Sequence, residues 1–548
     1  MRWWGWGEDA AAITLPGPAA HLLREQLDLS LPPVGQAGEE RGRRVELADV
    51  RLPEPSLPEA ARRALAEAVG SENVLDGTEE RLAHAAGRSY PDLVRLRRGD
   101  ASGAPDAVVL PNSGEQVAAV LRACAGAGVA VIPFGGGTSV VGGVEALRGR
   151  HAAAITLDLR RMDRVLGVDR TSLTASLEPG LMGPQLERLL AAEGLTLGHF
   201  PQSFQFSTLG GWVATRSAGQ ASTGYGRIDE LVQSLRCESP AGPLATRDVP
   251  ATAAGPSLRE LLVGSEGTLG VITQATVRVR PAPAERHYEG WSFRSFEDGV
   301  EALRALEQRR AAPDVARLSD AEETRLTMAL GSTGSTAERA GRAYLRLRGH
   351  EGGCLAFTGF EGPGEDVSRR RGRCASILRG AGAVSLGERP GRSWLRGRFS
   401  APYLRDELLD RGVMVETLET ATTWSGLHGL YATVGGALRE SLAARSTPPA
   451  VMCHVSHLYP SGASLYFTFL ARQEQGAELE QWRGAKTAAC DAIHAAGGTI
   501  THHHAVGTDH APWMEAEVGA LGIEALRAVK ERVDPTGVMN PGKLLPGA

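Results

Sequence analysis

The stretch Val129-Ala-Val-Ile-Pro-Phe-Gly-Gly-Gly-Thr-Ser139 decides the fold of this chain, because it joins a short apolar strand directly to a glycine-rich loop. Glycine lets backbone N–H groups approach anionic oxygens, and the two hydroxyl groups add donors, so the loop suits phosphate binding. It is not a P-loop, and residues 140–143 do not supply the G-x-G-x-x-G start of a Rossmann helix. Such a glycine cluster also occurs in plain turns, so its interpretation depends on the segments around it.

Predicted strands and helices alternate around this loop, which indicates an α+β fold. Ser113 can cap a helix that runs to residue 127, since the apolar positions of that segment share one helical face. The closely spaced prolines at residues 281 and 283 favour an extended chain and end this region. The predicted strands are residues 107–111, 129–133, 153–159, 173–177, 271–279 and 464–470, and the predicted helices are 58–69, 113–127, 180–193, 296–310 and 365–379.

Length and composition limit the class of protein. A chain of 548 residues is too long for one hydrophobic core, so we expect two or three packed domains. The net charge of −5 gives no reason to expect a nucleic-acid partner. Six scattered cysteines without a C-x-x-C pair, no signal peptide and no long apolar run favour a soluble protein of the cytoplasm. Only three of the 59 basic residues are lysines, which is typical of a GC-rich genome and favours a bacterial source.

Three downstream segments favour the phosphate-binding interpretation of the glycine-rich loop over a plain turn. They are Pro201-Gln-Ser-Phe-Gln-Phe-Ser-Thr-Leu-Gly-Gly211, Ala214-Thr-Arg-Ser-Ala-Gly219 and Gly264-Ser-Glu-Gly-Thr-Leu-Gly-Val-Ile-Thr273. With the loop, they resemble the PCMH-type FAD-binding flavoproteins, the family of vanillyl-alcohol oxidase and of the D-lactate and glycolate dehydrogenases. The resemblance implies FAD as the cofactor, bound non-covalently because this loop lacks the histidine to which some members attach it. The residues that it places against FAD are Pro133, Phe134, Gly135, Gly136, Gly137, Thr138, Ser139, Gln202, Ser203, Phe204, Gln205, Phe206, Ser207, Thr208, Thr215, Arg216, Ser217, Ala218, Glu266, Gly267, Thr268, Leu269, Gly270, Val271 and Ile272.

The same resemblance implies a division of the chain into four parts. Residues 1–103 form a helical segment and the start of the FAD domain, and residues 104–283 form the PCMH-type FAD-binding domain. Residues 284–497 form an α+β cap domain that binds substrate, and residues 498–548 complete the FAD site. A Pro/Gly/Arg stretch at residues 32–44 is interpreted as a connector.

The second half is similar to the ether-lipid-forming members of the family. It carries Cys453-His-Val-Ser-His-Leu-Tyr-Pro-Ser-Gly-Ala-Ser-Leu-Tyr466-Phe and Ile500-Thr-His-His-His-Ala-Val-Gly507, and it lacks the H-P-x-G-D-G-N-x-H stretch of the D-lactate-type dehydrogenases. Further matches are Trp3-x-Gly-Trp-Gly7, Ala316-Arg-Leu318, Tyr403-Leu-Arg-Asp406 and Val533-Asp-Pro535. Ala505 and Thr508 depart from the animal pattern, which has glycine and lysine there.

This likeness implies a transferase of ether-lipid biosynthesis. Its members exchange the acyl chain of acyl-dihydroxyacetone phosphate for a long-chain fatty alcohol, through a covalent adduct at flavin N5 and without net redox. Such a path needs a proton donor, a proton acceptor and a cation for anionic groups. The candidates are Tyr466 and the three histidines as acid and base, and Arg405 as the cation for phosphate or carboxylate. Arg317 is the candidate for support of the flavin or the active-site loop. If residues 502–504 lie on a strand, His502 and His504 share one face and His503 takes the other.

Each assignment has a competing interpretation. Tyr466 fits a satisfied core tyrosine, and the three histidines fit a surface tract or, with His454 and His457, a zinc site; the prediction made here is that no metal is bound. The alternative function is an FAD-dependent dehydrogenase or oxidase of 2-hydroxy acids such as D-lactate or glycolate. A third hypothesis is a flavin-binding protein or lipid carrier without catalysis. The lipid substrates suggest transient contact with a membrane surface, and a homodimer is carried as a prediction.

Overall fold

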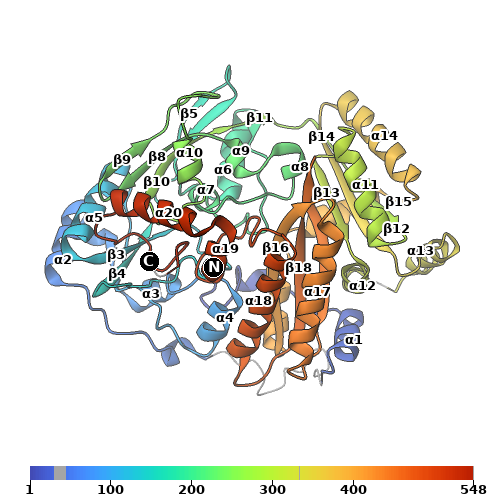
Figure 1. Ribbon diagram of the computed structural model, residues 1–548, viewed down its shortest axis with the longest axis horizontal. Helices are drawn as coiled ribbons and strands as arrows, with labels where there is room; N and C mark the ends of the chain where they lie inside the picture. Colours follow the sequence, from blue (N-terminus) through green and yellow to red (C-terminus); the bar gives the residue numbers. More distant parts are fainter. Residues whose placement is uncertain (30–44, 333, 547–548) are drawn as a thin grey trace.

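The computed structural model describes residues 1–29, 45–332 and 334–546. Two halves lie side by side, each built on its own β-sheets, and the chain end returns from the second half to the first (Figure 1). The connector predicted at residues 32–44 lies outside the described residues. In the part of the chain that is described, no helix combines the length and the apolar character needed to cross a membrane.

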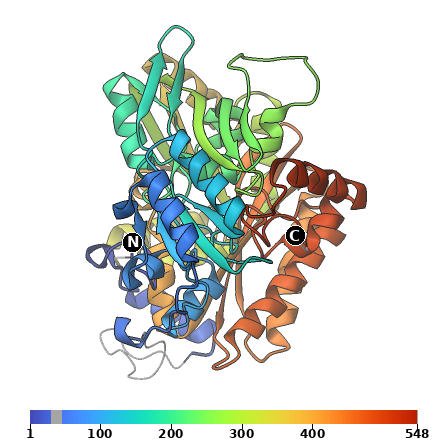
Figure 2. The ribbon, with the colours of Figure 1, turned by 90° about the vertical axis from the view of Figure 1, so that its left-hand side faces the viewer.

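The strand in residues 129–139 lies at the edge of a four-stranded sheet in the first half. This half faces the viewer in Figure 2. Strand β3 (Val129–Phe134) pairs in parallel with β4 (Ala153–Asp158), which is buried throughout. The predicted helix before it is confirmed as α5 (Gly114–Ala127), and the Ser113 hydroxyl accepts the N–H of Gln116 as its cap. The other elements of this part are α2 (Glu59–Val69), β1 (Val74–Leu75), α3 (Thr78–Ala83) and β2 (Ala107–Val109), whereas α1 (Gly17–Gln26) and α4 (Tyr90–Arg97) pack against the second half.

A five-stranded antiparallel sheet, in the order β5-β6-β10-β8-β9, completes the first half. The helix predicted at residues 180–193 begins only at Gly183, with a proline in its first turn, where the missing N–H is tolerated. The elements are β5 (Val165–Asp169), β6 (Thr174–Leu177), α6 (Gly183–Ala192), β7 (Leu195–Thr196), α7 (Leu209–Ala214), α8 (Ser222–Tyr225), α9 (Ile228–Leu231), β8 (Val232–Ser239), β9 (Gly242–Ala245), α10 (Leu258–Leu262), β10 (Val271–Arg278) and β11 (Arg280–Pro281).

The second half is a seven-stranded antiparallel sheet in the order β15-β12-β14-β13-β17-β18-β16. Helices cover it, and α17 packs against α18 over its last strands (Figure 1). The elements are β12 (Glu285–Phe293), α11 (Phe296–Gln308), β13 (Val315–Ser319), α12 (Ala321–Leu330), α13 (Thr336–Leu347), β14 (Cys354–Gly362), α14 (Gly364–Gly380), β15 (Val384–Gly387), α15 (Glu388–Gly397), α16 (Ala401–Asp410), β16 (Val413–Thr423), α17 (Leu427–Ala443), β17 (Ala450–Tyr459), β18 (Gly462–Arg472) and α18 (Glu478–Ala495).

Alternation along β18 gives this sheet two different faces. Leu465, Phe467 and Phe469 are fully buried in the helix-covered core, so Tyr466 between them must face the opposite side. The same rule places Arg317 of β13 and His454 of β17 on that opposite side. The sheet therefore presents a second face that is polar around Tyr466 and is covered at one end by α1, α12 and α16, and a site can be built on its polar part.

The chain returns to the first half through α19 (Met514–Val518) and α20 (Ala520–Val533). Lys530 of α20 donates its ammonium N–H groups to the carbonyls of Thr268 and Met539 and to the Asp534 carboxylate, at 2.8–3.0 Å. Met539 also forms a β-bridge with Val131 of the quoted strand. The C-terminal segment is thus built into the first half.

Candidate active site

The glycine-rich loop has the free donors that a phosphate group requires. Among the described residues, no protein atom accepts a hydrogen bond from the backbone N–H groups of residues 135–139. Gly137 has φ +65°, a conformation that side-chain-bearing residues rarely adopt. An array of unpaired N–H groups in a partly buried turn is a binding site for anionic oxygens, so the loop fits the pyrophosphate of FAD.

The four segments predicted to bind FAD lie against one another. A Cβ atom on Gly136 would stand 1.7 Å from the Phe206 carbonyl oxygen, and one on Gly135 would stand 2.2 Å from Thr208 Oγ1. The Glu266 N–H donates to the Ala214 carbonyl at 2.9 Å. The structure therefore brings the loop, residues 202–208, residues 214–218 and residues 264–272 into one place.

Several of the predicted cofactor residues direct their side chains elsewhere. Phe204, Ile272 and Val271 are buried in apolar cores, so only their backbone faces the loop region. Arg216 pairs with Asp229 and Glu260. These residues position the segment, and they offer FAD no side-chain donor in this arrangement.

Glu266 joins this region to the chain that follows the three histidines. Its carboxylate accepts the N–H groups of Val506 and Gly507 at 2.8 and 2.7 Å. Burial raises the pKa of Glu266 to about 7, although these two donors oppose the shift. The histidine segment is thereby fastened beside the proposed FAD site.

A row of polar side chains crosses the polar face of the seven-stranded sheet. His454 on β17 stands directly opposite Tyr466 on β18, and Tyr466 stands directly opposite Glu419 on β16. Directly opposite residues of antiparallel strands share a face and lie close together. The His454 and Tyr466 rings stack with centroids 4.7 Å apart.

The three histidines do not form a strand, so the predicted sharing of faces by His502 and His504 is wrong. The backbone instead wraps around the buried Glu419 carboxylate, which accepts the N–H groups of all three histidines. This wrapping brings His502 and His503 together, with Nδ1 atoms 2.9 Å apart. Glu419 was missed in the sequence; it is one of two carboxylates, with Glu416, in the otherwise apolar and hydroxyl-bearing strand Val413–Thr423, and the sequence alone does not say which of the two faces the site.

The electrostatics of the cluster follow from this arrangement. Burial raises the pKa of a carboxyl group, yet His503, His504 and His502 and the N–H donors hold the pKa of Glu419 well below its usual range. Burial lowers the pKa of His504 to about 3 and also lowers those of His502 and His503. At neutral pH the cluster therefore contains an ionised carboxylate and neutral imidazoles.

Tyr466 is the complementary partner of these imidazoles. Burial raises its pKa to about 12, so it remains a protonated phenol. Its ring lies edge-on to His504, with centroids 5.3 Å apart, and is stacked 6.1 Å from His503. A proton donor and proton acceptors thus meet at one point of the sheet.

Arg405 supplies a cation without a protein partner for most of its donors. One Nη atom donates to the Arg88 carbonyl at 2.7 Å, whereas Nε and the other Nη are buried and have no hydrogen-bond partner among the described residues. A buried unpaired guanidinium is costly unless an anion binds it. Arg88, a second buried arginine nearby, was missed in the sequence because this chain has so many arginines.

The amino-terminal tryptophan motif packs against the neighbours of this cation in helix α16. The backbone N–H of Trp6 donates to the Asp406 carboxylate at 2.6 Å, and the Trp6 ring meets Phe206 edge-on with centroids 5.6 Å apart. Two motifs some 400 residues apart in the sequence, Trp3–Gly7 and Tyr403–Asp406, are therefore packed together at the site.

Arg317 lies on β13, next to the β17 end of the row formed by His454, Tyr466 and Glu419. Its guanidinium is bonded to Glu323 and lies 3.1 Å from His454 Nδ1. His454 in turn stacks on Tyr466. Arg317 is thus placed to position His454 and Tyr466, and its predicted support of the flavin or the active-site loop stays a prediction.

Three ring nitrogens, one each from His457, His502 and His503, lie within 4.8 Å of one another. A divalent ion could bridge such nitrogens. The Ser222 hydroxyl is hydrogen-bonded to His457 Nδ1 at 2.6 Å, and the Tyr459 hydroxyl is hydrogen-bonded to His502 Nε2 at 2.7 Å. These hydrogen bonds occupy one nitrogen of His457 and one of His502, and the absence of a metal stays a prediction.

Known proteins define the class of this molecule. The FAD binding domain family matches residues 105–246, and the C-terminal domain family of the FAD-linked oxidases matches residues 282–544. The fold and the donor-rich loop are thus those of an FAD-dependent flavoprotein.

Whole-chain relatives give the particular family. An alkyldihydroxyacetonephosphate synthase of Dictyostelium discoideum is 37% identical over 85% of this chain and 77% of its own length. That of Trypanosoma brucei brucei is 32% identical over 100% of this chain and 92% of its own. A solved alkyldihydroxyacetonephosphate synthase structure superposes with a TM-score of 0.85 at 32% identity, covering 99% of both chains. The chain belongs to the alkyldihydroxyacetonephosphate synthase family.

Proposed function

We propose that this protein exchanges the acyl chain of acyl-dihydroxyacetone phosphate for a long-chain fatty alcohol and so forms the alkyl ether. The observation that carries the proposal is the meeting of the protonated Tyr466 with neutral histidines beside a donor-rich loop. When bound, FAD supplies the electron sink at the carbon next to the ketone that ester displacement requires. The protein itself has to bind the anionic ends and move protons.

Tyr466 and His504 take the proton-transfer roles in this proposal. The neutral His504 imidazole accepts a proton, and the Tyr466 phenol donates one, since each is held in the required protonation state by burial. Glu419 holds the histidines in place through their backbone N–H groups. Glu419, His454 and Arg317 are positioning residues.

Arg405 binds an anionic part of the substrate, the phosphate or the departing carboxylate. Its two unpaired donors match the planar fork that such groups accept. Burial already lowers the pKa of Arg405, so an incoming anion would relieve an unfavourable charge.

The test uses palmitoyl-dihydroxyacetone phosphate and labelled hexadecanol with the FAD-loaded protein. Labelled ether, formed without consumption of oxygen or of an added electron acceptor, is the expected result. Reduction of the flavin by D-lactate or D-2-hydroxyglutarate, with no ether formed, would transfer the function to the 2-hydroxy acid dehydrogenases.

Contact with a membrane surface is part of this proposal, because both substrates carry long chains. Helix α13 (Thr336–Leu347) buries none of the side chains described for it, and Leu347 and Tyr344 are 84% and 45% exposed beside Arg342 and Arg346. Exposed apolar and basic side chains on one helix favour an anionic lipid interface. Co-sedimentation with anionic vesicles that Leu347→Glu weakens would support this contact; equal sedimentation of both proteins would contradict it. A homodimer stays a prediction, which light scattering can check.

A further inference from the structure

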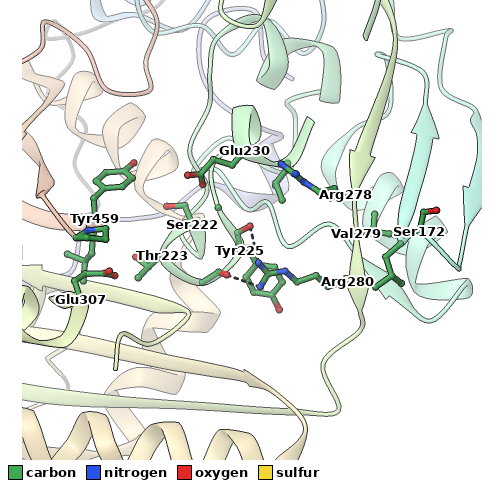
Figure 3. Close-up of a pocket in the computed structure, with 16 residues that line it drawn as sticks. Ser172, Ser222, Thr223, Tyr225, Glu230, Arg278, Val279, Arg280, Glu307 and Tyr459 are labelled. Carbon is green, nitrogen blue, oxygen red and sulfur yellow. Dashed lines mark hydrogen bonds between the residues drawn. The ribbon is translucent and has the colours of Figure 1, made fainter. Parts of the chain in front are cut away.

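A cavity of about 590 Å³ lies between the two halves (Figure 3). Arg278 of β10 lines it on one side and Tyr459 of β17 on the other. Glu230 and Pro460, both exposed, also line it, so the cavity reaches the surface. None of the residues predicted to contact FAD is among its lining residues.

A continuous chain of hydrogen bonds connects this cavity to the proposed site. The Tyr459 hydroxyl lies 2.7 Å from His502 Nε2, and His502 Nδ1 lies 2.9 Å from His503 Nδ1. The His503 ring then stacks near Tyr466. Arg227 donates to the Tyr459 hydroxyl and so fixes its place on the cavity wall.

The neighbouring His457 offers no such chain. Ser222, which lines the same cavity, bonds His457 Nδ1 at 2.6 Å. The His457 ring packs against His502 and His503, with centroids 5.1 and 4.9 Å away, but makes no hydrogen bond to either ring. The connected route therefore runs through Tyr459.

The proposed exchange releases a proton in each turnover. A bond forms between the alcohol oxygen and the carbon that carried the ester, and the bond from that carbon to the carboxylate oxygen breaks. The carboxylate leaves with the electron pair, and the hydroxyl proton of the alcohol is lost. No oxidant or reductant is needed, but one proton must reach solvent from a site whose histidines are almost fully enclosed.

We propose that Tyr459 and His502 relay protons between His503 and the cavity; this inference rests on the proposed exchange function. A neutral imidazole donates from one nitrogen and accepts at the other, so both hydrogen bonds of the chain can point outward together. The His503 ring lies next to the acceptor His504, with centroids 4.9 Å apart. A proton that passes from His504 to His503 is then matched by one released from the Tyr459 hydroxyl. Tyr459 and His502 are relay residues and make no contact with substrate in this scheme.

The test compares Tyr459→Phe with Tyr225→Phe in the FAD-loaded protein. Tyr225 lines the same cavity and loses the same atom, but its hydroxyl donates to Glu361 at 2.7 Å and does not reach the histidines. We expect Tyr459→Phe to lower kcat for ether formation by about tenfold, less than the ~10²–10⁴-fold typical of direct proton-transfer groups. FAD content and KM should be unchanged, the solvent isotope effect on kcat should increase, and added imidazole should restore the rate through the open cavity. Tyr225→Phe should behave as the wild type.

Three results would overturn the relay. One is a Tyr459→Phe enzyme with wild-type kcat and isotope effect. Another is a loss of rate that imidazole does not restore and that accompanies a loss of FAD, since this is the behaviour of a structural residue. The third is one equivalent of a divalent metal in the purified protein that is lost in His502→Ala, because the relay nitrogens would then be occupied. If the wild type itself forms no ether, the proposed function fails first, and the relay is then rejected with it.

Discussion

The two parts of the site are built from different material. At the glycine-rich loop the donors are backbone N–H groups, and side chains are excluded by close packing, as at Gly136. On the seven-stranded sheet the working groups are side chains, and strand register brings His454, Tyr466 and Glu419 into one row. The residues of the glycine-rich loop are consecutive in the sequence. The row of side chains on the sheet forms only after strands far apart in the sequence have paired. Mutations should therefore separate cofactor binding from chemistry.

The largest effect is expected from Gly136→Ala. The new methyl group would stand 1.7 Å from the Phe206 carbonyl oxygen, which is backbone and cannot move aside cheaply. We expect almost complete loss of FAD and a fall of ~1–3 kcal/mol in the free energy of unfolding, the usual cost of overpacking. Flavin absorbance per protein and urea unfolding measure the two effects.

Gly126→Ala is the matched control for that change. Gly126 lies in helix α5, and a Cβ atom there would meet nothing within 4 Å. Replacing a helical glycine by alanine should raise stability by up to ~1 kcal/mol and leave FAD bound. Equal FAD content in the two variants would show that the loop does not depend on close backbone approach.

The next effect is that of Glu419→Gln. An amide cannot accept the N–H groups of all three histidines as the carboxylate does. Ether formation should fall about 100-fold, in the range typical of misplaced proton-transfer groups, while FAD stays bound. Glu416→Gln is the control, since Glu416 lies on the same strand but accepts from Trp482 on the helix-covered side. Equal activity of the two variants would remove Glu419 from the site.

The pH dependence of stability gives Glu419→Gln a second test. A carboxylate whose pKa is depressed in the folded state stabilises the protein above its unfolded pKa, and this contribution is lost as the pH falls through the folded value. The difference in unfolding free energy between the wild type and Glu419→Gln should be constant above about pH 5 and shrink below it. Urea unfolding at pH 7 and pH 4 measures it; a difference that grows on acidification would contradict the assignment.

A smaller effect is expected from Arg405→Lys. Lysine keeps the charge but loses the planar fork. The KM for the acyl substrate should rise about tenfold, the loss of one charge-assisted hydrogen bond, with FAD unchanged. Arg411→Lys, in which Glu407 can still pair with the new ammonium group, should leave KM as it is. An unaltered KM in Arg405→Lys would mean that its unpaired donors do not meet substrate.

The same contrast explains which parts of the fold and of the site could be predicted from the sequence. The loop, its neighbouring strand and the helix capped by Ser113 were predictable, because each depends on residues close together along the chain. Tyr466, Arg405 and the histidines were found through family resemblance. Glu419 and Tyr459 were not, since nothing in an isolated strand says which residue will stand opposite it. The expected alternation of the histidines failed because three backbone N–H groups bind one carboxylate in place of a neighbouring strand.

The smallest effect concerns a departure from the family pattern. Ala505 has φ +75°, where the resembling animal sequences carry glycine. A non-glycine residue in the left-handed region costs roughly 1–2 kcal/mol, so Ala505→Gly should be more stable by about 1 kcal/mol. Thermal unfolding measures this gain; a lower midpoint would show that the methyl group contributes more through packing than it costs in backbone strain.

Proton transfer is assigned to Tyr466 of the sheet and to His504 of the segment that wraps around Glu419, and the binding of FAD is assigned to the glycine-rich loop. This assignment is tested most directly by measuring flavin absorbance and labelled ether formation in parallel on Tyr466→Phe and His504→Ala. We expect full FAD content and loss of ether formation by at least ~100-fold in both variants. Ether formation at the wild-type rate in both variants, with FAD bound, would contradict it.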